Sequence, residues 1–226
     1  MLKYILSITY MSFLNTILNI IFPVNCISCG KTGNDICIEC LGTFPVAERE
    51  SAKWIYPLFE YRHPLIKKSI WLLKYKGKKR IAKIFAEILY GKILEELSDL
   101  SIMENFHDAI LIPIPLSPKR RRERGFNQAE LICQEIIKLD KNENLILEKS
   151  VLIKPKDTEH QARIEDRNKR LKNIIGSFAI KNSEKIKKRN IILIDDVSTT
   201  GATLSEAKKI LKQAGAKKII AFTVAH

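Results

Sequence analysis

The strongest constraint on this chain is a short apolar run that ends in two adjacent carboxylates. Residues 190–197 read Asn-Ile-Ile-Leu-Ile-Asp-Asp-Val, and residues 198–203 continue as Ser-Thr-Thr-Gly-Ala-Thr. The apolar run predicts a buried β-strand, and the pattern after it predicts that the loop opens directly into a helix. In open α/β sheets, ligands bind outside the carboxyl ends of the strands, where helix N-termini present free N–H groups. The segment therefore predicts a phosphate-binding turn.

The side chains of this turn suit a sugar phosphate. Gly201 allows the main chain to approach a phosphate closely, and the threonine hydroxyls add uncharged donors. Asp195 and Asp196 are expected to accept hydrogen bonds from vicinal ribose hydroxyls and to help hold a hydrated Mg²⁺ ion. An acidic pair here can also serve only to compensate the helix dipole, but the attached Thr-Thr-Gly-x-Thr run favours the ligand site.

The rest of the chain predicts an α/β fold. From Ala109 onward, short apolar runs alternate with helical patterns, as a mostly parallel sheet with crossover helices requires. Asn127 is expected to cap the helix that follows it, and Cys133 is expected to be a small core residue. The expected strands are 54–61, 109–115, 145–153, 177–180, 190–197 and 218–224, and the expected helices begin at 64, 81, 127 and 203.

Four of the five cysteines form two closely spaced pairs, Cys26 with Cys29 and Cys37 with Cys40. Each pair can present two thiolates to one tetrahedral ion, so the spacing predicts a structural zinc site with a closed coordination shell. Gly30 and Gly33 permit the tight reversal that so short a loop needs. Disulfide pairing is the alternative, disfavoured because the chain shows no export signal.

The N-terminal segment 1–22 is apolar but carries a polar stripe at helical spacing, which predicts an amphipathic helix rather than a signal peptide or membrane span. The helix is expected to pack on the domain or on a partner, and contact with a membrane surface is the alternative. Three parts are expected: this helix, a four-cysteine zinc module over 23–45, and the α/β domain over 46–226. The formal net charge of +14, from 39 Lys and Arg against 25 Asp and Glu, favours polyanionic partners. Those include nucleic acid, phosphorylated ligands and an anionic membrane surface.

The segment 194–203 resembles the phosphoribosyl pyrophosphate (PRPP) signature of type I phosphoribosyltransferases. The resemblance implies a phosphoribosyltransferase-like sheet flanked by helices. It implies that the acidic pair binds the ribose and the loop binds the 5′-phosphate. The PRPP-binding residues expected on this basis are Asp195, Asp196, Ser198, Thr199, Thr200, Gly201, Ala202 and Thr203.

Further segments are similar in order and spacing to the ComF competence family. They are 112–115, the basic segment 121–129, the segment from Gln161 through Arg170 to Phe178, and the cysteine pairs. The first segment is expected to form the pyrophosphate loop, and arginines suit pyrophosphate because their planar fork donates two bonds. A flap is expected over 158–173, contributing Gln161, Arg163 and Arg170. The residues expected on the pyrophosphate side are Pro113, Ile114, Arg121 and Arg124.

The family resemblance implies a cytoplasmic role in natural transformation, assisting single-stranded DNA inside the inner membrane together with helicase or translocation proteins. Basic residues interleaved with aromatic ones independently favour single-strand binding. The DNA contacts expected on this basis are Lys74, Lys76, Lys78, Lys79 and Arg80. The alternative is an active transferase with a nitrogen acceptor. Purine salvage is disfavoured, because Ser198 stands where several salvage enzymes carry a carboxylate that handles the base.

Overall fold

The computed structural model describes residues 23–47, 52–104, 106, 108–155 and 174–226. The chain divides into two compact units, with the boundary between Phe44 and Pro45. The expected N-terminal helix lies outside the described residues. No described helix combines the length and apolar character that crossing a membrane requires.

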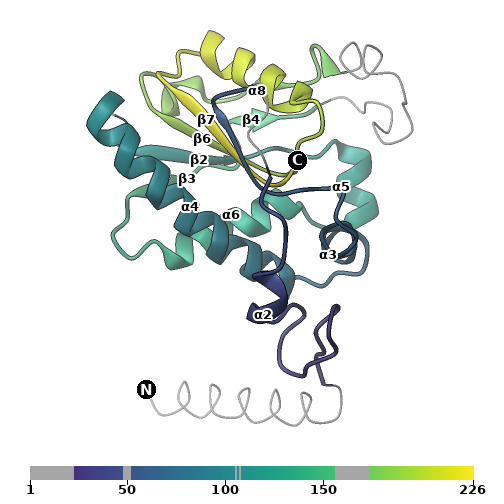
Figure 1. The fold of residues 1–226 in the computed structure, drawn as a ribbon. Helices are drawn as coiled ribbons and strands as arrows, with labels where there is room; N and C mark the ends of the chain where they lie inside the picture. Colours follow the sequence, from purple (N-terminus) through teal and green to yellow (C-terminus); the bar gives the residue numbers. More distant parts are fainter. Residues whose placement is uncertain (1–22, 48–51, 105, 107, 156–173) are drawn as a thin grey trace, which may run out of the picture. The chain divides into compact units, whose positions relative to one another are not determined.

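The larger unit is built on a five-stranded parallel sheet (Figure 1). Its strand order is β1-β7-β6-β2-β3, with registers such as Leu193 beside Ala221 and Leu111 beside Ile192. A second, antiparallel sheet contains only β4 and β5. The strands are β1 (Ile55–Phe59), β2 (Ala109–Pro113), β3 (Leu145–Leu147), β4 (Leu152–Ile153), β5 (Ala179–Ile180), β6 (Ile191–Val197) and β7 (Ile219–Ala225). The helices are α2 (Ile38–Leu41), α3 (Pro64–Tyr75), α4 (Arg80–Glu104), α5 (Pro118–Arg124), α6 (Gln128–Leu139) and α8 (Ala202–Gln213), with a 3₁₀ turn at Ser183–Lys185.

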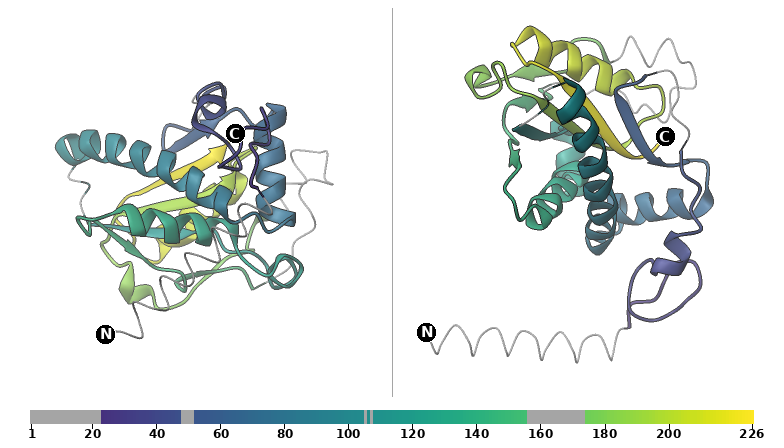
Figure 2. Two further views of the ribbon diagram at one scale, coloured as in Figure 1. Left: turned by 90° about the horizontal axis from the view of Figure 1, so that it is seen from below. Right: turned by 60° about the vertical axis from the view of Figure 1, so that its left-hand side comes forward.

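Helices cover both faces of the sheet, which explains why the central strands are apolar on both sides. Helices α4 and α6 lie on one face and α8 lies on the other (Figures 1 and 2). Ile191 and Leu193 of β6 belong to the same hydrophobic cluster as Leu204 and Ala207 of α8. Alternate residues of β6 therefore point to opposite helical layers.

The direction in which the chain leaves the sheet reverses between β2 and β6. From β2 the chain passes through α5 and α6 to β3, whereas from β6 it passes through α8 to β7 on the other side. Because β2 and β6 are adjacent and parallel, their carboxyl ends border one crevice. Crevices at such reversals are where open α/β sheets bind ligands.

Most predicted elements are confirmed. Asn127 caps α6 by accepting a hydrogen bond from the amide of Ala129 at 3.1 Å, and Cys133 is fully buried. The expected strand over 145–153 is wrong as one element, because it contains two short strands that join different sheets. The predicted helices do not include 118–124, yet this segment forms α5. Its signals are Pro118 in the first helical turn and Gly125 at φ 74° after the last.

Candidate functional site

The two carboxylates lie near the carboxyl end of β6 and point to opposite faces of the sheet. Alternate residues of a strand share a face of the sheet, so Asp195 lies on the face of Leu193, which packs on α8. Asp196 lies on the opposite face, with Ile194. The amide of Asp196 donates to Asp195 Oδ1 at 2.8 Å, which fixes the first carboxylate. The pair therefore reaches both sides of the crevice from a single strand.

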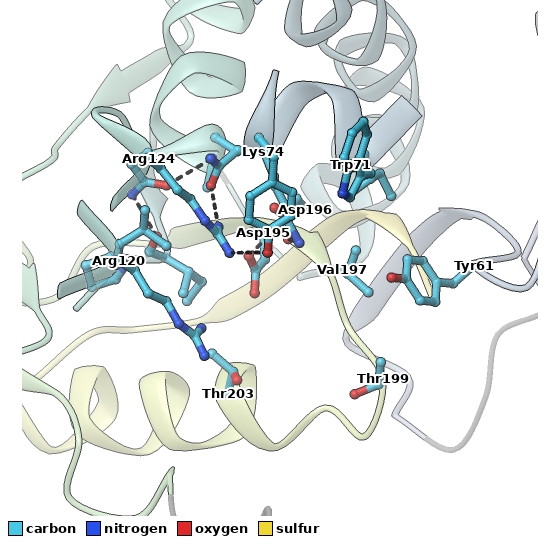
Figure 3. Close-up of a pocket in the computed structure, with 18 of the residues that line it drawn as sticks. Tyr61, Trp71, Lys74, Arg120, Arg124, Asp195, Asp196, Val197, Thr199 and Thr203 are labelled. Carbon is cyan, nitrogen blue, oxygen red and sulfur yellow. Dashed lines mark hydrogen bonds and ion pairs between the residues drawn. The ribbon is translucent and has the colours of Figure 1, made fainter. Parts of the chain in front are cut away.

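Lys74 of α3 forms an ion pair with Asp196, at 2.9 Å between Nζ and Oδ1 (Figure 3). Burial and the neighbouring Asp196 carboxylate raise the pKa of Asp195 to about 7, although Lys74 opposes that rise. Two carboxylates beside one ammonium leave an excess of negative charge at this point. The arrangement favours a further cation or several hydroxyl donors here.

The Thr-Gly loop connects this pair to α8. Gly201 has φ 70°, a left-handed conformation that glycine adopts at little cost, and it precedes the first residue of α8. Within the described part of the chain, no hydrogen bond is donated by the amides of Thr199, Thr200 or Gly201. These amides, together with the first turn of α8, line a small recess whose free N–H groups suit an anion.

The recess adjoins a larger pocket of about 340 Å³. Asp195, Asp196, Thr199 and Thr203 line this pocket, so the acidic pair is accessible rather than sealed in the core. Five cationic side chains line it as well, which gives the wall an excess of positive charge over the two carboxylates. These are Lys67, Lys74, Arg120, Arg124 and Lys154.

Helix α5 directs Arg120 and Arg124 toward the pocket and Arg121 away from it. Arg120 and Arg124 are four residues apart and both line it. Figure 3 shows Arg120 extending toward the start of α8, where Thr203 lies. Arg121 instead pairs with Glu130 at 2.8 Å. Desolvation and the charge of Arg124 lower the pKa of Arg120.

Helix α3 supplies the opposite wall through one helical stripe. Lys67, Ile70, Trp71 and Lys74 recur at intervals of three and four residues, and all line the pocket. A core position for Trp71 is an equally reasonable interpretation of the sequence, but 47% of the residue is exposed. Lys76, Lys79 and Arg80 are exposed in or beside the turn after α3, and Lys78 is half-buried there.

The remaining predicted residues divide into three groups. Ile114 lines the pocket, whereas Pro113 is buried at the end of β2. Ser198 and Ala202 are both buried at the recess. The predicted flap residues Gln161, Arg163 and Arg170 lie outside the described residues.

Sequence reasoning missed several pocket residues. Nothing in the sequence distinguishes Arg120 from an ordinary exposed basic turn, and Lys154, which is only 9% exposed, stands at the start of a highly charged run. Gln128 is 1% exposed and accepts a hydrogen bond from Arg124 at 2.9 Å. The spacing of Arg120 and Arg124 is a readable signal once a helix is allowed there, whereas nothing local marks Lys154.

In the small unit, the four N-terminal cysteines converge. The sulfur atoms of Cys26, Cys29, Cys37 and Cys40 all lie within 4.8 Å of one another, with Cys29 and Cys37 3.6 Å apart. Tetrahedral coordination at about 2.3 Å places neighbouring sulfur atoms about 3.8 Å apart. The cluster can therefore hold a metal ion of zinc's size and preference.

One of these thiols is poised to ionise. Burial raises the pKa of Cys26, but backbone N–H groups of Cys29, Cys37 and Ser28 directed at its sulfur outweigh burial and lower the pKa to about 6. The Cys37 amide donates to this sulfur at 3.4 Å. Thiolate is the form that binds metal.

The geometry defines a protein of the phosphoribosyltransferase class, and comparison with known sequences agrees. A sequence model described as the phosphoribosyl transferase domain matches residues 139–226. "Competence protein F" of Haemophilus influenzae is 30% identical over 203 residues, which cover 84% of this chain and 81% of that protein. This protein therefore belongs to the competence protein F (ComF) family of type I phosphoribosyltransferase-like proteins.

Other relatives are similar over smaller shares. "Competence protein ComFC" of Streptococcus pneumoniae is 35% identical over 153 residues, which cover 67% of this chain and 59% of that relative. "DNA utilization protein YhgH" of Escherichia coli K12 is 27% identical over 187 residues, covering 81% of this chain and 74% of the relative.

Proposed function

We propose that the pocket binds Mg²⁺-chelated PRPP. The recess at Thr199–Thr203 takes the 5′-phosphate, because it combines a helix N-terminus with backbone N–H groups that donate no hydrogen bond within the described part of the chain. Asp195 and Asp196 take the ribose hydroxyls. Arg120 and Arg124 face the pyrophosphate, with Ile114 and Pro115 shaping the wall beside it.

The observation that carries this proposal is the joining of an acidic pair to a basic pocket. A basic pocket alone suits any polyanion, and a carboxylate pair alone suits many hydroxyl ligands. Their combination within one cavity matches a ligand with a neutral diol between phosphate groups. Both chemistries border the same space here.

Mg²⁺ fits this site because oxygen donors are present at the point of excess negative charge. Asp195 and Asp196 would hold it through water, and the ion would neutralise part of the pyrophosphate charge. Lys74 already neutralises Asp196 in the free protein. The protein's own contribution is therefore to orient the ribose and the phosphates and to limit the repulsion between them.

Calorimetry with Mg²⁺ and PRPP tests this assignment. In the Asp195→Asn/Asp196→Asn variant, affinity should fall by at least tenfold, because the variant removes both carboxylates that hold the ribose and the magnesium ion. The matched control is Glu87→Gln/Glu95→Gln on α4, which changes the net charge equally outside the pocket and should bind as wild type. Equal binding by the aspartate variant would show that the ligand is held elsewhere.

We further propose that the biological output is the handling of single-stranded DNA during natural transformation, at the inner face of the cytoplasmic membrane and with DNA-translocation proteins as partners. The names "competence protein" and "DNA utilization protein" of its relatives support this role. Physical support comes from three exposed basic residues, Lys76, Lys79 and Arg80. They follow Lys74 and Tyr75, which line the pocket, by a few residues in the chain. Backbone binding to such residues is electrostatic and falls with salt.

Anisotropy of a labelled oligo(dT) at increasing salt tests the DNA role. Affinity should fall steeply with salt, and the slope should decrease in Lys78→Gln/Lys79→Gln/Arg80→Gln by about 0.7 for every phosphate that the variant no longer neutralises. The control is Lys187→Gln/Lys209→Gln/Lys217→Gln, which removes as much charge from exposed positions outside the pocket. A slope unchanged in the first variant would remove those residues from the interface.

The alternative is transfer of the phosphoribosyl group from PRPP to a nitrogen acceptor. The pocket extends beyond the acidic pair toward Trp71, which leaves space for an acceptor. Ser198 supplies no acid or base at neutral pH, and its buried hydroxyl has no partner among the described residues. Release of pyrophosphate from PRPP with any of a panel of nucleobases and amines would establish this activity.

For the small unit we propose a structural zinc ion held by Cys26, Cys29, Cys37 and Cys40. Four thiolate ligands leave no position open for catalysis. The ion would supply the folding energy of a loop that has little apolar surface to bury.

A further inference from the structure

The wall of the pocket that α3 supplies carries aromatic rings that PRPP does not require. Tyr61, Trp71 and Tyr75 all line the cavity. Trp71 and Tyr75 are four residues apart on α3, with ring centroids 6.2 Å apart and planes inclined at 45°. Figure 3 shows Trp71 and Tyr61 on one side of Asp196 and Arg120 on the other.

Two of these rings are more exposed to solvent than is favourable for such large aromatic side chains. Trp71 is 47% exposed and Tyr75 is 50% exposed, although their helix has a buried face available at Ile66, Ile70 and Leu73. A tryptophan that packs on the core gains from burying its large surface. Rings left at the mouth of a pocket instead offer faces to a ligand.

Each ring is accompanied by a cation. Lys76 Nζ lies 5.4 Å from the Trp71 ring centroid, Lys67 lies 5.8 Å from Tyr61, and the Arg124 guanidinium lies 5.2 Å from Tyr75. Arg124 also donates to the Tyr75 hydroxyl at 3.3 Å, which holds that ring at the pocket edge. Alternating aromatic faces and cations match the alternation of bases and phosphates along a nucleic-acid strand.

We infer that Trp71, with Tyr75 and Tyr61, forms a stacking platform for a base of single-stranded DNA at the mouth of the phosphate pocket. This inference rests on the proposed DNA role and assigns it a site. The bases stack on the rings, and the intervening phosphates lie beside Lys67 and Lys76. A strand fits better than a free base because the platform is half in solvent and each ring has its own cation nearby, which can pair with a phosphate between the bases.

The test uses the intrinsic fluorescence of Trp71. The chain has two tryptophans, and Trp54→Phe leaves Trp71 as the only indole. Oligo(dT) should quench its emission in that background. Trp71→Ala should weaken oligo(dT) binding about 5- to 160-fold, the range expected for losing one stacked base. Trp71→Phe should retain most of the affinity, because a ring remains.

Two controls separate stacking from general damage. Leu94→Ala removes another exposed apolar side chain, on α4 and outside the pocket, and should bind oligo(dT) as wild type. The far-ultraviolet circular dichroism of Trp71→Ala should match that of wild type, which would show that the variant is folded.

The outcomes distinguish the platform from the DNA role itself. If wild-type protein binds oligo(dT) and Trp71→Ala binds it equally, or if Trp71 emission stays unchanged at saturation, the platform is refuted while the DNA role stands. Absence of oligo(dT) binding by wild type, even at low salt, would refute both. If free thymine quenches Trp71 and displaces oligo(dT), the platform binds a free heterocycle, and the proposal that it binds a DNA strand is wrong.

Discussion

Asp195 is the residue whose charge state the fold alters most clearly within the site. Burial and Asp196 raise its pKa from 3.8 to about 7, so this carboxyl retains a proton at mildly acidic pH. Binding of a cation or of a diol would favour the ionised form. The protein therefore holds this carboxyl in an unfavourable environment for its charge, as binding and catalytic sites often do.

This shift predicts a pH dependence of stability in the absence of ligand. Between about pH 4 and pH 7, Asp195 is ionised in the unfolded chain but protonated in the folded one, so unfolding releases a proton and the free energy of unfolding falls as the pH rises. Asp195→Asn lacks this contribution. Urea unfolding across pH 4–8 should show wild type losing stability relative to the variant up to about pH 7, then a constant difference. A constant difference throughout would contradict the assigned shift.

Arg120 and Arg121 are neighbours on one helix, but only Arg120 lines the pocket. Adjacent residues on a helix point about 100° apart, so two neighbours can have different surroundings. Arg120 lines the pocket together with Arg124, whereas Arg121 pairs with Glu130. A basic run in the sequence cannot choose between neighbours before the helix that carries them is known.

At the scale of elements, Asn127 connects the two segments that we propose form the pyrophosphate side. Its side-chain carbonyl oxygen accepts from the Ala129 amide at the start of α6, and its Nδ2 donates to the Ile114 carbonyl at 2.9 Å. Only 6% of this residue is exposed. One side chain thus joins the loop after β2 to the helix beyond α5.

Asn127→Ala should lower the free energy of unfolding by about 2 kcal/mol, because the helix loses its cap and the Ile114 carbonyl loses a buried donor. Affinity for Mg²⁺ and PRPP should fall as well, since Ile114 and the start of α6, where Gln128 holds Arg124, lose the side chain that joins them. Urea denaturation and calorimetry measure the two effects. The exposed Asn142→Ala is the control and should change stability by less than about 0.5 kcal/mol. Equal stabilities of the two variants would show that the cap contributes little.

At the scale of the whole molecule, the chain combines two units that depend on different forces. The unit after Phe44 has a large apolar core around β6, β7 and α8. The cysteine unit has few buried side chains among its described residues, and its four thiols lie close enough together to hold one metal ion. Loss of metal should therefore affect one unit and spare the other.

Metal analysis should find one zinc ion per wild-type chain and none in Cys37→Ser. Cys133→Ala changes a cysteine outside the cluster and should retain the ion. Binding of Mg²⁺ and PRPP by Cys37→Ser should remain near wild type, because the residues that line the pocket all belong to the second unit. Zinc retained at full occupancy in Cys37→Ser would contradict the four-ligand site, and loss of PRPP binding would contradict the independence of the units.

The sequence by itself determined the features that depend on local chemistry. The strand 191–197, the Asp195–Asp196 pair at its end and the Asn127 cap all follow from short-range patterns, because hydrophobic periodicity and capping act within a few residues. The paired spacing of the cysteines belongs to the same class. Each of these features can be predicted from neighbouring residues in the sequence, without knowing which distant segments pack against them.

Only the tertiary structure decided which distant residues share the pocket. The sequence groups Lys74 with the lysines after it, yet the helical stripe of α3 brings it to Asp196, more than a hundred residues away in sequence. Lys154 reaches the same pocket from the segment after β4. The physical reason is that the packing of helices on a sheet selects one face of each helix, and that selection depends on the neighbouring elements rather than on the local run of residues.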